Sequence, residues 1–229
     1  MTHPSSPNSI DPRHLAVVGA GPRLGAAIGR GFGREGFHVT LLSRGATSLD
    51  AVGNDVRRTG AQVGQIVADP AQPEQLRATL ATLYRSVGAP GLVIYNASIL
   101  APDSLLTTDV GHLHEAYDVG VVGAIVATQV AAPVMQAAGG GTILFTGGGF
   151  ADHPIKELAT VSLGKAALRS AATMFSADLA DQRIRLASVT IAGQVTAGTA
   201  FDADRIADAY WNIVTGPAGE WRSEFRYEG

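Results

Sequence analysis

A glycine-rich segment near the beginning of the sequence has the residue types that bind a phosphate group. It follows the apolar run 14–19 and reads Gly19-Ala20-Gly21-Pro22-Arg23-Leu24-Gly25. Glycines let the backbone turn tightly and approach a pyrophosphate, and a helix that begins directly afterwards offers free N–H groups and the positive end of its dipole. The segment therefore predicts a dinucleotide site formed by Gly19, Gly21, Arg23, Leu24 and Gly25. A tight turn without a ligand is the alternative.

Ser43 and Arg44 follow the next apolar run, 37–42, at a place where the side chain separates NAD from NADP. An acidic residue there would bind the ribose 2′-hydroxyl of NAD, whereas an arginine accommodates the 2′-phosphate of NADP. Ser43 and Arg44 therefore predict NADP, with NADPH preferred over NADH, although Arg44 could be a solvated loop residue. Asp69 ends the third run and could accept a hydrogen bond from the adenine amine, or cap the helix that follows Pro70.

The elements that position these residues follow from the alternation of two kinds of segment. Short apolar runs predict strands at 14–19, 37–42, 63–68, 92–95, 142–146 and 185–191, and 221–227 could add an edge strand. Segments with helical spacing lie between them at 23–35, 46–59, 72–87, 109–138, 156–182 and 202–215. This order predicts an α/β fold with a doubly wound parallel sheet, a Rossmann fold, whose ligand crevice lies at the carboxyl ends of the strands.

The length and composition limit the class of protein. The 229 residues suit one domain, predicted at 13–229 with the substrate pocket inside it, after a flexible tail at 1–12. The absence of cysteine excludes thiolate metal sites and thiol catalysis, and His112 and His114 make a poor metal site, so no metal is predicted. A net charge of −3 with scattered basic residues argues against nucleic-acid binding. No apolar stretch resembles a membrane span or a signal peptide, which predicts a cytoplasmic protein.

Two predicted helices, 109–138 and 156–182, contain long segments that are apolar around most of their circumference. A helix of this kind is buried on two sides, and the sheet can cover only one of them. We therefore predict a homo-oligomer, a dimer or a tetramer, built on these helices. A covering loop from the same chain is the alternative.

Taken in order, these landmarks resemble the short-chain dehydrogenase/reductase family over about residues 14–200. The glycine turn is similar to the family's cofactor loop, with Arg23 in place of the usual middle glycine. Further landmarks are Asp69, which resembles the adenine-contacting aspartate, Asn96-Ala97-Ser98, Lys165, and Ala192-Gly193, which resembles a Pro-Gly pair. The resemblance implies that Asn96, Ala97, Lys165 and Gly193 contact the cofactor, and that Val195, Thr196 and Thr199 are candidates to hold its nicotinamide amide.

The catalytic residues of that family are Asn, Ser, Tyr and Lys, and only the lysine, Lys165, is present here. The family's spacing places Val161 at the tyrosine position, Gly148 at the serine position and Gly120 at or near the asparagine position. A positioned proton donor typically contributes about 10²- to 10⁴-fold in rate. The resemblance therefore implies a weak ketone reductase unless another group has replaced the phenol.

Several residues could supply the missing proton. Lys165 could act directly as an acid, and Ser162 and Thr146 carry hydroxyls close to it in sequence or strand position. His153 is the preferred replacement because histidine titrates near neutral pH, although a loop histidine is more often simply exposed. Val161 and the glycine run 147–149 predict a roomy apolar pocket, which suits an apolar or bulky small-molecule substrate.

Three functions are compatible with these residues. The first is an NADP(H)-dependent oxidoreductase that reduces an imine or iminium, an enone or a bulky carbonyl compound. The second is a cofactor-binding protein without redox turnover: a sensor, a scaffold or an inactive subunit. The third is a pocket reused for non-redox chemistry such as elimination or cyclisation, with His153 or Asp152 as the base.

Overall fold

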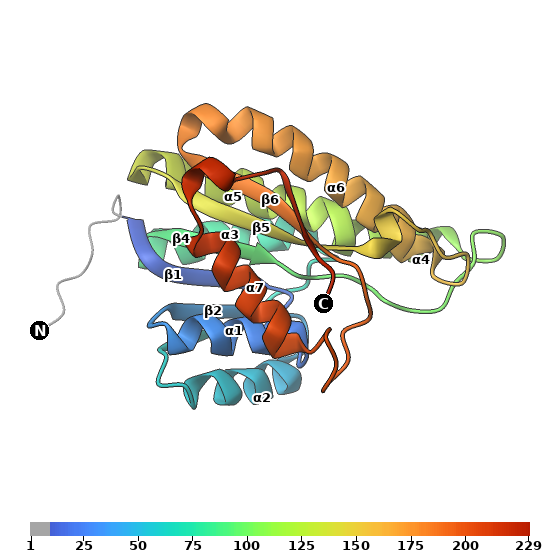
Figure 1. Ribbon diagram of the computed structural model, residues 1–229, viewed down its shortest axis with the longest axis horizontal. Coiled ribbons are helices and arrows are strands. Elements are labelled where there is room, and N and C mark those ends of the chain that lie inside the picture. Colours follow the sequence, from blue (N-terminus) through green and yellow to red (C-terminus); the bar gives the residue numbers. More distant parts are fainter. Residues whose placement is uncertain (1–9) are drawn as a thin grey trace, which may run out of the picture.

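The computed structural model describes residues 10–229, which form a seven-stranded parallel sheet covered by helices on both faces (Figure 1). The strand order is β3-β2-β1-β4-β5-β6-β7. The strands are β1 (Ile10–Val18), β2 (His38–Ser43), β3 (Val63–Val67), β4 (Ala89–Tyr95), β5 (Gly141–Gly148), β6 (Ile184–Ile191) and β7 (Glu224–Tyr227). The predicted doubly wound α/β fold is confirmed, and the predicted edge strand at the end of the chain is β7, which pairs with β6.

Helices fill each connection between consecutive strands up to β7. They are α1 (Leu24–Arg34), α2 (Ala46–Arg57), α3 (Pro73–Val87), α4 (Val110–Tyr117), α5 (Gly123–Ala138), α6 (Ala159–Leu179) and α7 (Ala203–Thr215). A π-helical turn, η1 (Asp118–Val122), joins α4 to α5, so the predicted helix 109–138 is one helical run with an irregular turn inside it. The predicted helix 156–182 begins later, at Ala159, and its last residues form a 3-10 turn.

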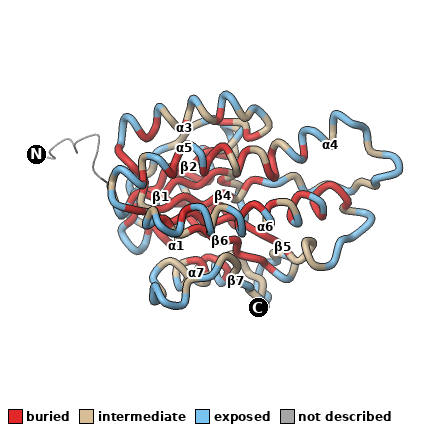
Figure 2. The backbone as a smooth tube through the Cα atoms, turned by 90° about the horizontal axis from the view of Figure 1, so that it is seen from above, coloured by how far each residue is buried: buried red, intermediate tan, exposed pale blue. Residues whose placement is uncertain are grey.

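Two apolar layers hold the sheet between them, and Figure 2 shows the buried backbone concentrated along the strands. One layer joins residues of α3, α5 and α6 to one face of the sheet, and the other joins α1, α2 and α7 to the opposite face. Neighbouring residues of β5 illustrate the division, because Phe145 belongs to the first layer and Leu144 to the second. Strands buried on both faces explain why their sequences are continuous apolar runs rather than alternating patterns.

The first strand begins earlier than its sequence predicts. Ile10 and Asp11 pair with Ala89 and Pro90 of β4, so residues 10–12 of the predicted tail belong to the sheet, and the rest of that tail lies outside the described residues. The pairing shifts register between Asp11 and Leu15. Proline lacks the N–H that a ladder needs, so Pro12 and Pro90 concealed a strand that contains a bulge.

The helical run from Val110 to Ala138 corrects one expectation from the sequence. By length and composition alone this run could cross a membrane, contrary to the expectation that no apolar stretch resembles a span. More than half of its most apolar window is buried inside the protein, where α5 packs against α3 and β4. A helix between a sheet and a second helix needs the same apolar composition as a membrane span.

His14 of β1 gives the fold a predictable response to acid. Its Nε2 lies 2.9 Å from Thr40 Oγ1, whereas its buried Nδ1 has no partner in the described part of the chain. Burial lowers the pKa of His14 from 6.5 to about 4. The fold therefore accommodates neutral His14, whose contribution to stability is complete above pH 6.5 and is lost as the pH falls through 4.

We predict that the free energy of unfolding falls by about 2 kcal/mol when the pH is lowered from 7 to 5, because the unfolded chain binds a proton at His14 that the folded chain does not. Urea unfolding at both pH values measures this difference. His14→Gln should flatten the pH dependence, whereas the control His38→Gln, at a half-exposed neighbour, should keep most of it. An equal pH dependence in wild type and His14→Gln would contradict the assignment.

Candidate active site

The glycine segment forms a tight turn at the carboxyl end of β1. Gly19 has a positive φ of 88°, and a side chain there would overlap the backbone of Ala97. Gly25 lies against the Ala20 backbone, where a Cβ would come within 2.8 Å of Ala20 Cα. Gly21 instead faces open space, with nothing within 4 Å of where its Cβ would be. Two glycines therefore close the turn, and the third leaves its outer side open.

The first turn of α1 has the free donors that an anion requires. No side chain caps this helix, no acidic residue lies in its first turn, and Arg23 stands at the N-cap position with Leu24 and Gly25 directly after it. The first N–H groups of a helix have no acceptors inside it, and they carry its positive dipole end. The open side of Gly21 and the uncapped helix thus fit a pyrophosphate, as a dinucleotide site requires.

Asn96 and Ala97 join the end of β4 to this turn. The Asn96 side chain donates from Nδ2 to the carbonyl of Gly19 at 2.8 Å, and its backbone N–H donates to Val18. The structure therefore brings the two parts of the predicted cofactor site together. Asn96 also has a structural role, because its amide fixes the glycine turn.

The residues predicted to read the adenosine half of the cofactor lie at the ends of β2 and β3. Ser43 is the last residue of β2, and the exposed Arg44 guanidinium is 3.5 Å from the carboxylate of Glu115 on α4. Asp69 caps its own turn, because its Oδ1 accepts from the N–H of Ala71 at 3.0 Å. The structure thus shows a local role for Asp69, and it places a carboxylate beside Arg44 that the sequence did not predict.

The segment after β6 is a compact loop. Gly193 allows the ring of Phe201 to pack closely, since a Cβ would approach that ring to 2.6 Å. The N–H of Thr196 donates to the Phe201 carbonyl, and Thr199 Oγ1 donates back to the Thr196 carbonyl at 2.8 Å. Val195 packs partly against the apolar layer of α7, while Thr196 and Thr199 are exposed. The loop therefore keeps both threonines at the surface near the carboxyl end of β6.

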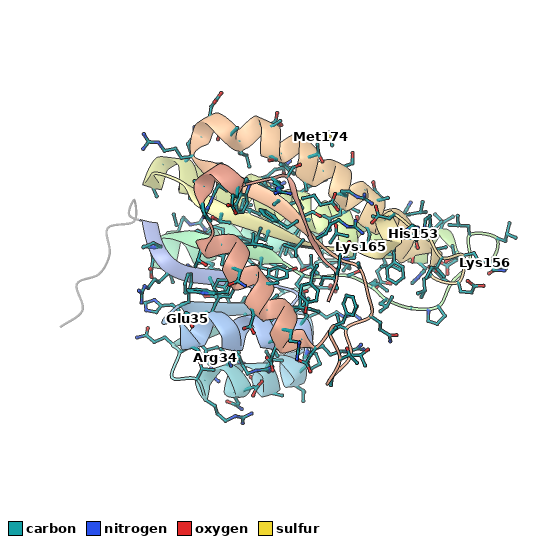
Figure 3. The ribbon with its side chains drawn as sticks, viewed as in Figure 1. Arg34, Glu35, His153, Lys156, Lys165 and Met174 are labelled. Carbon is teal, nitrogen blue, oxygen red and sulfur yellow. The ribbon has the colours of Figure 1, made fainter. Side chains whose placement is uncertain are left out.

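Lys165 is buried in α6, and its amine reaches the end of β5 (Figure 3). Nζ donates to the carbonyl of Thr146 at 2.7 Å, and no carboxylate of the described chain forms an ion pair with it. Burial without a counter-charge lowers the pKa of Lys165 to about 8. A lysine with this pKa is a stronger acid than a solvated one and can exchange a proton near neutral pH.

The resemblance implies hydroxyl side chains at Gly148 and Val161, and neither residue has one. A Cβ added to Gly148 would lie 3.7 Å from Cγ of Lys165, so this position faces the lysine as the family's spacing implies. Val161, one helical turn before Lys165, is buried and apolar. Gly120 lies within the π-helical turn and has nothing within 4 Å of where a Cβ would be.

The π-helical turn is held by Tyr95 of β4. Its phenol donates to the carbonyl of Val119 at 2.5 Å, from within the core. Gly123 leaves room for this phenol, because a Cβ there would overlap the phenol oxygen. The contact with Tyr95 therefore stabilises the irregular turn, which no local pattern in the sequence predicts.

The predicted replacement proton donors differ in whether their polar atoms already form hydrogen bonds within the protein. Ser162 Oγ donates to the Leu158 carbonyl and accepts from the Ile155 N–H, which gives it a role in starting α6. Thr146 Oγ1 accepts the phenol proton of the buried Tyr210 at 2.8 Å. His153 is exposed and lies farther out than Lys165, on the side where Lys156 projects (Figure 3). Ser162 and Thr146 thus have structural partners, and His153 has a solvent-facing ring.

Asp152, considered as a base, is instead a bridging carboxylate. Arg226 of β7 and Arg169 of α6 each donate to it at 2.7 Å. These hydrogen bonds, that from Arg226 first, lower the pKa of Asp152, so it stays ionised and is a weak base at neutral pH. Asp152 therefore fixes the loop before α6 to the last strand, and its use as a base stays a prediction.

Sequence reasoning also missed Asp103, which caps α6 from a distant loop. Its carboxylate accepts from the N–H of Ala159 at 2.5 Å and of Thr160 at 3.1 Å, and His112 Nε2 lies 3.6 Å away. Burial acts to raise the pKa of Asp103, but these hydrogen bonds outweigh it and lower the pKa. A cap supplied from so far along the chain leaves no local signal, so only the folded structure reveals it.

The family model of short chain dehydrogenases matches residues 13–205, and the chain belongs to this family. An uncharacterized oxidoreductase of Mycobacterium tuberculosis is 28% identical over 181 residues, which cover 79% of this chain and 68% of that protein. An uncharacterized oxidoreductase of Methylorubrum extorquens is 24% identical over 193 residues, 84% of this chain and 77% of the relative.

Solved structures share the whole fold. L-Sorbose reductase from Gluconobacter frateurii, complexed with NADPH and L-sorbose, has a TM-score of 0.85 at 18% identity and covers 97% of this chain and 96% of its own. A metagenomic short-chain oxidoreductase in complex with NADP has a TM-score of 0.85 at 24% identity and covers 96% of this chain and 99% of its own.

Other expectations from the sequence stay predictions. The proposed oligomer helices expose Leu163 and Met174 of α6, and Figure 3 shows Met174 on the outer side of that helix. The homo-oligomer through 109–138 and 156–182, the apolar or bulky substrate and the cytoplasmic location all remain to be tested. Within residues 10–229, no group of three or more metal-ligating side chains comes together.

We predict that Gly123→Ala reduces the free energy of unfolding by about 2 kcal/mol, because the new methyl group overlaps the Tyr95 phenol. In a Tyr95→Phe background the same change should cost much less, since the overlapping oxygen is gone. Gly120→Ala, in open space within the same turn, is the matched control. Additive effects of Gly123→Ala and Tyr95→Phe in a double-mutant cycle would contradict the contact.

Proposed function

We propose that this protein is an NADP(H)-dependent oxidoreductase whose active site keeps the family's lysine without its phenol. The observation that carries the proposal is Lys165, buried at the end of β5 between Gly148 and Val161, two positions without a hydroxyl. A buried lysine without an ionic partner costs stability, so its place at the expected catalytic position argues for use rather than accident.

The residues around the crevice fit the cofactor. The open side of Gly21 and the uncapped start of α1 would hold the pyrophosphate, and Arg44 would meet a 2′-phosphate. Lys165 and the loop from Gly193 to Thr196 would hold the nicotinamide half. Bound NADPH supplies a hydride. Two fold relatives are described as complexes with NADPH or NADP, which supports this choice of cofactor.

The site has no phenol to donate a proton, and this limits the class of substrate that it can reduce. An iminium carbon accepts a hydride without simultaneous protonation, and an enone can take its proton later from water. Imines or iminium ions and enones therefore suit this site, as do bulky carbonyl compounds if Lys165 itself donates the proton. Val161 and Gly148 leave the substrate side apolar and without side-chain bulk, which favours such substrates.

One observation favours the alternative, a cofactor-binding protein without redox turnover. Ser162 and Thr146 have structural hydrogen bonds, and Asp152 stays ionised between two arginines. If Lys165 and His153 do not donate a proton, and no iminium or enone enters the site, a nucleotide would bind without being oxidised. The lowered pKa of Asp152 also weakens the non-redox alternative, because it makes this carboxylate a weaker base.

Arg44 and Glu115 give a matched test of the cofactor preference. We predict that Arg44→Ala weakens NADPH binding about tenfold and changes NADH binding little, because only NADPH carries the 2′-phosphate. Glu115→Gln should instead strengthen NADPH binding, since the carboxylate beside Arg44 repels the phosphate and competes for the guanidinium. Calorimetric titration of both cofactors measures these changes. Equal losses for NADPH and NADH in Arg44→Ala would contradict the proposed contact.

The two lysines of the chain give a matched test of the reaction. We predict that NADPH oxidation is faster with 2-methyl-1-pyrroline or 2-cyclohexenone than with cyclohexanone, and that Lys165→Met lowers the rate at least about 100-fold. Lys156→Met, at an exposed position, should leave it unchanged. Tight NADPH binding without oxidation by any acceptor in the panel would instead favour the protein without turnover.

A further inference from the structure

A cavity of about 670 Å³ lies at the end of the sheet opposite to Lys165. Thr142, which lines it, is the second residue of β5, whereas Gly148 beside Lys165 ends the same strand. Six residues of extended chain span about 20 Å, so the two places are separate. In Figure 1 the strands begin on the side of the amino terminus and run toward α4, which shows the two ends apart. The volume lies in the range of small-molecule sites.

Arg185 of β6 lies within this cavity, half-buried. Its Nη2 donates to Thr142 Oγ1 and to the Val214 carbonyl, both at 3.1 Å, and its guanidinium carbon lies 4.6 Å from the centre of the Trp221 ring. Nε and Nη1 make no hydrogen bond within the described chain, and no described carboxylate pairs with this residue. Burial without a counter-ion lowers the pKa of Arg185. A positive charge held in this way attracts an anion.

Arg183, an exposed residue, also lines this cavity. It is the one described non-glycine residue with a positive φ, 59°, a conformation that favours glycine or asparagine. The turn packs closely, since a Cβ on Gly140 would lie 2.5 Å from the Arg183 carbonyl oxygen. The chain thus keeps an arginine where glycine would be less strained. Such an outlier supports a functional hypothesis when a site lies beside it.

The rest of the lining is apolar or uncharged. Phe37, Ile184, Val214 and Trp221 contribute apolar surface, and the described lining contains no acidic residue. Two positive charges on an apolar cavity define the ligand that would bind: an anionic group to meet the arginines and an apolar body to cover the surface beside them.

We propose that this cavity binds a small organic carboxylate with an apolar body, at a site separate from the candidate active site. The carboxylate would accept hydrogen bonds from Arg185 and Arg183, and its body would lie against Trp221 and Val214. The proposal rests on the cavity and its charges and does not depend on the proposed redox activity.

Calorimetric titration of the full chain with 4-phenylbutyrate and its neutral analogue 4-phenylbutyramide tests the charge requirement. We expect the carboxylate to bind at least about tenfold more tightly than the amide, because only the carboxylate can neutralise the arginines. Absence of carboxylate binding, or equal affinity for the two probes, would overturn the proposal.

Substitutions locate the site. Arg185→Met should weaken carboxylate binding at least about tenfold, but it also removes bonds to Thr142 and Val214. Arg183→Asn is the second variant, because asparagine tolerates the positive φ. This variant should fold well and should weaken carboxylate binding several-fold.

Two control variants should bind the carboxylate normally. They are Arg222→Gln, outside the lining, and Lys165→Met, in the candidate active site. Unchanged binding in both Arg185→Met and Arg183→Asn, or loss of binding in Lys165→Met, would show that the carboxylate binds elsewhere.

Discussion

The parallel pairing of β1 with β4 is the constraint on which the rest of the site depends. These strands are separated in sequence by two strand–helix units, yet Val18 pairs with Tyr95 in the middle of the sheet. The chain order reverses at this pair, since β2 and β3 lie on one side and β5 to β7 on the other. The loops after β1 and β4 therefore leave the sheet in a common crevice, and the Asn96 amide joins them.

The second half of the site depends on a similar convergence at Thr146. Its carbonyl accepts from Lys165 of α6, and its hydroxyl accepts from Tyr210 of α7, helices that belong to opposite layers. Asp152 then fixes the loop after β5 to α6 and β7 through its two arginines. The polar groups around Lys165 therefore serve mainly to hold the backbone in place, while burial lowers the pKa of the lysine itself.

The sequence predicted much of the fold because continuous apolar runs and helical spacing are local properties. It also predicted that Gly19 and Gly21 follow the first strand and that Lys165 lies on a helix, as the structure shows. It could not predict features set by distant contacts: Asp103 caps α6 from another loop, and Glu115 approaches Arg44 from α4. Pro12 and Pro90 argued against strands at these positions, because proline lacks the N–H of a regular ladder. The register shift in β1 accommodates them. The state of Asp152 likewise depends on Arg226, far away in sequence.

The acceptor of the Lys165 hydrogen bond has a consequence for how this protein can change its chemistry. Every residue type carries a backbone carbonyl, so no side-chain substitution at Thr146 removes the group that orients the amine. Gly148 beside Lys165, and Gly120 in the π-helical turn, leave space where a side chain would fit. Mutations there can accumulate with little penalty to folding, since stability depends on other contacts. The frame around the lysine is thus mutationally robust, and new reactivity can evolve on it without first rebuilding the fold.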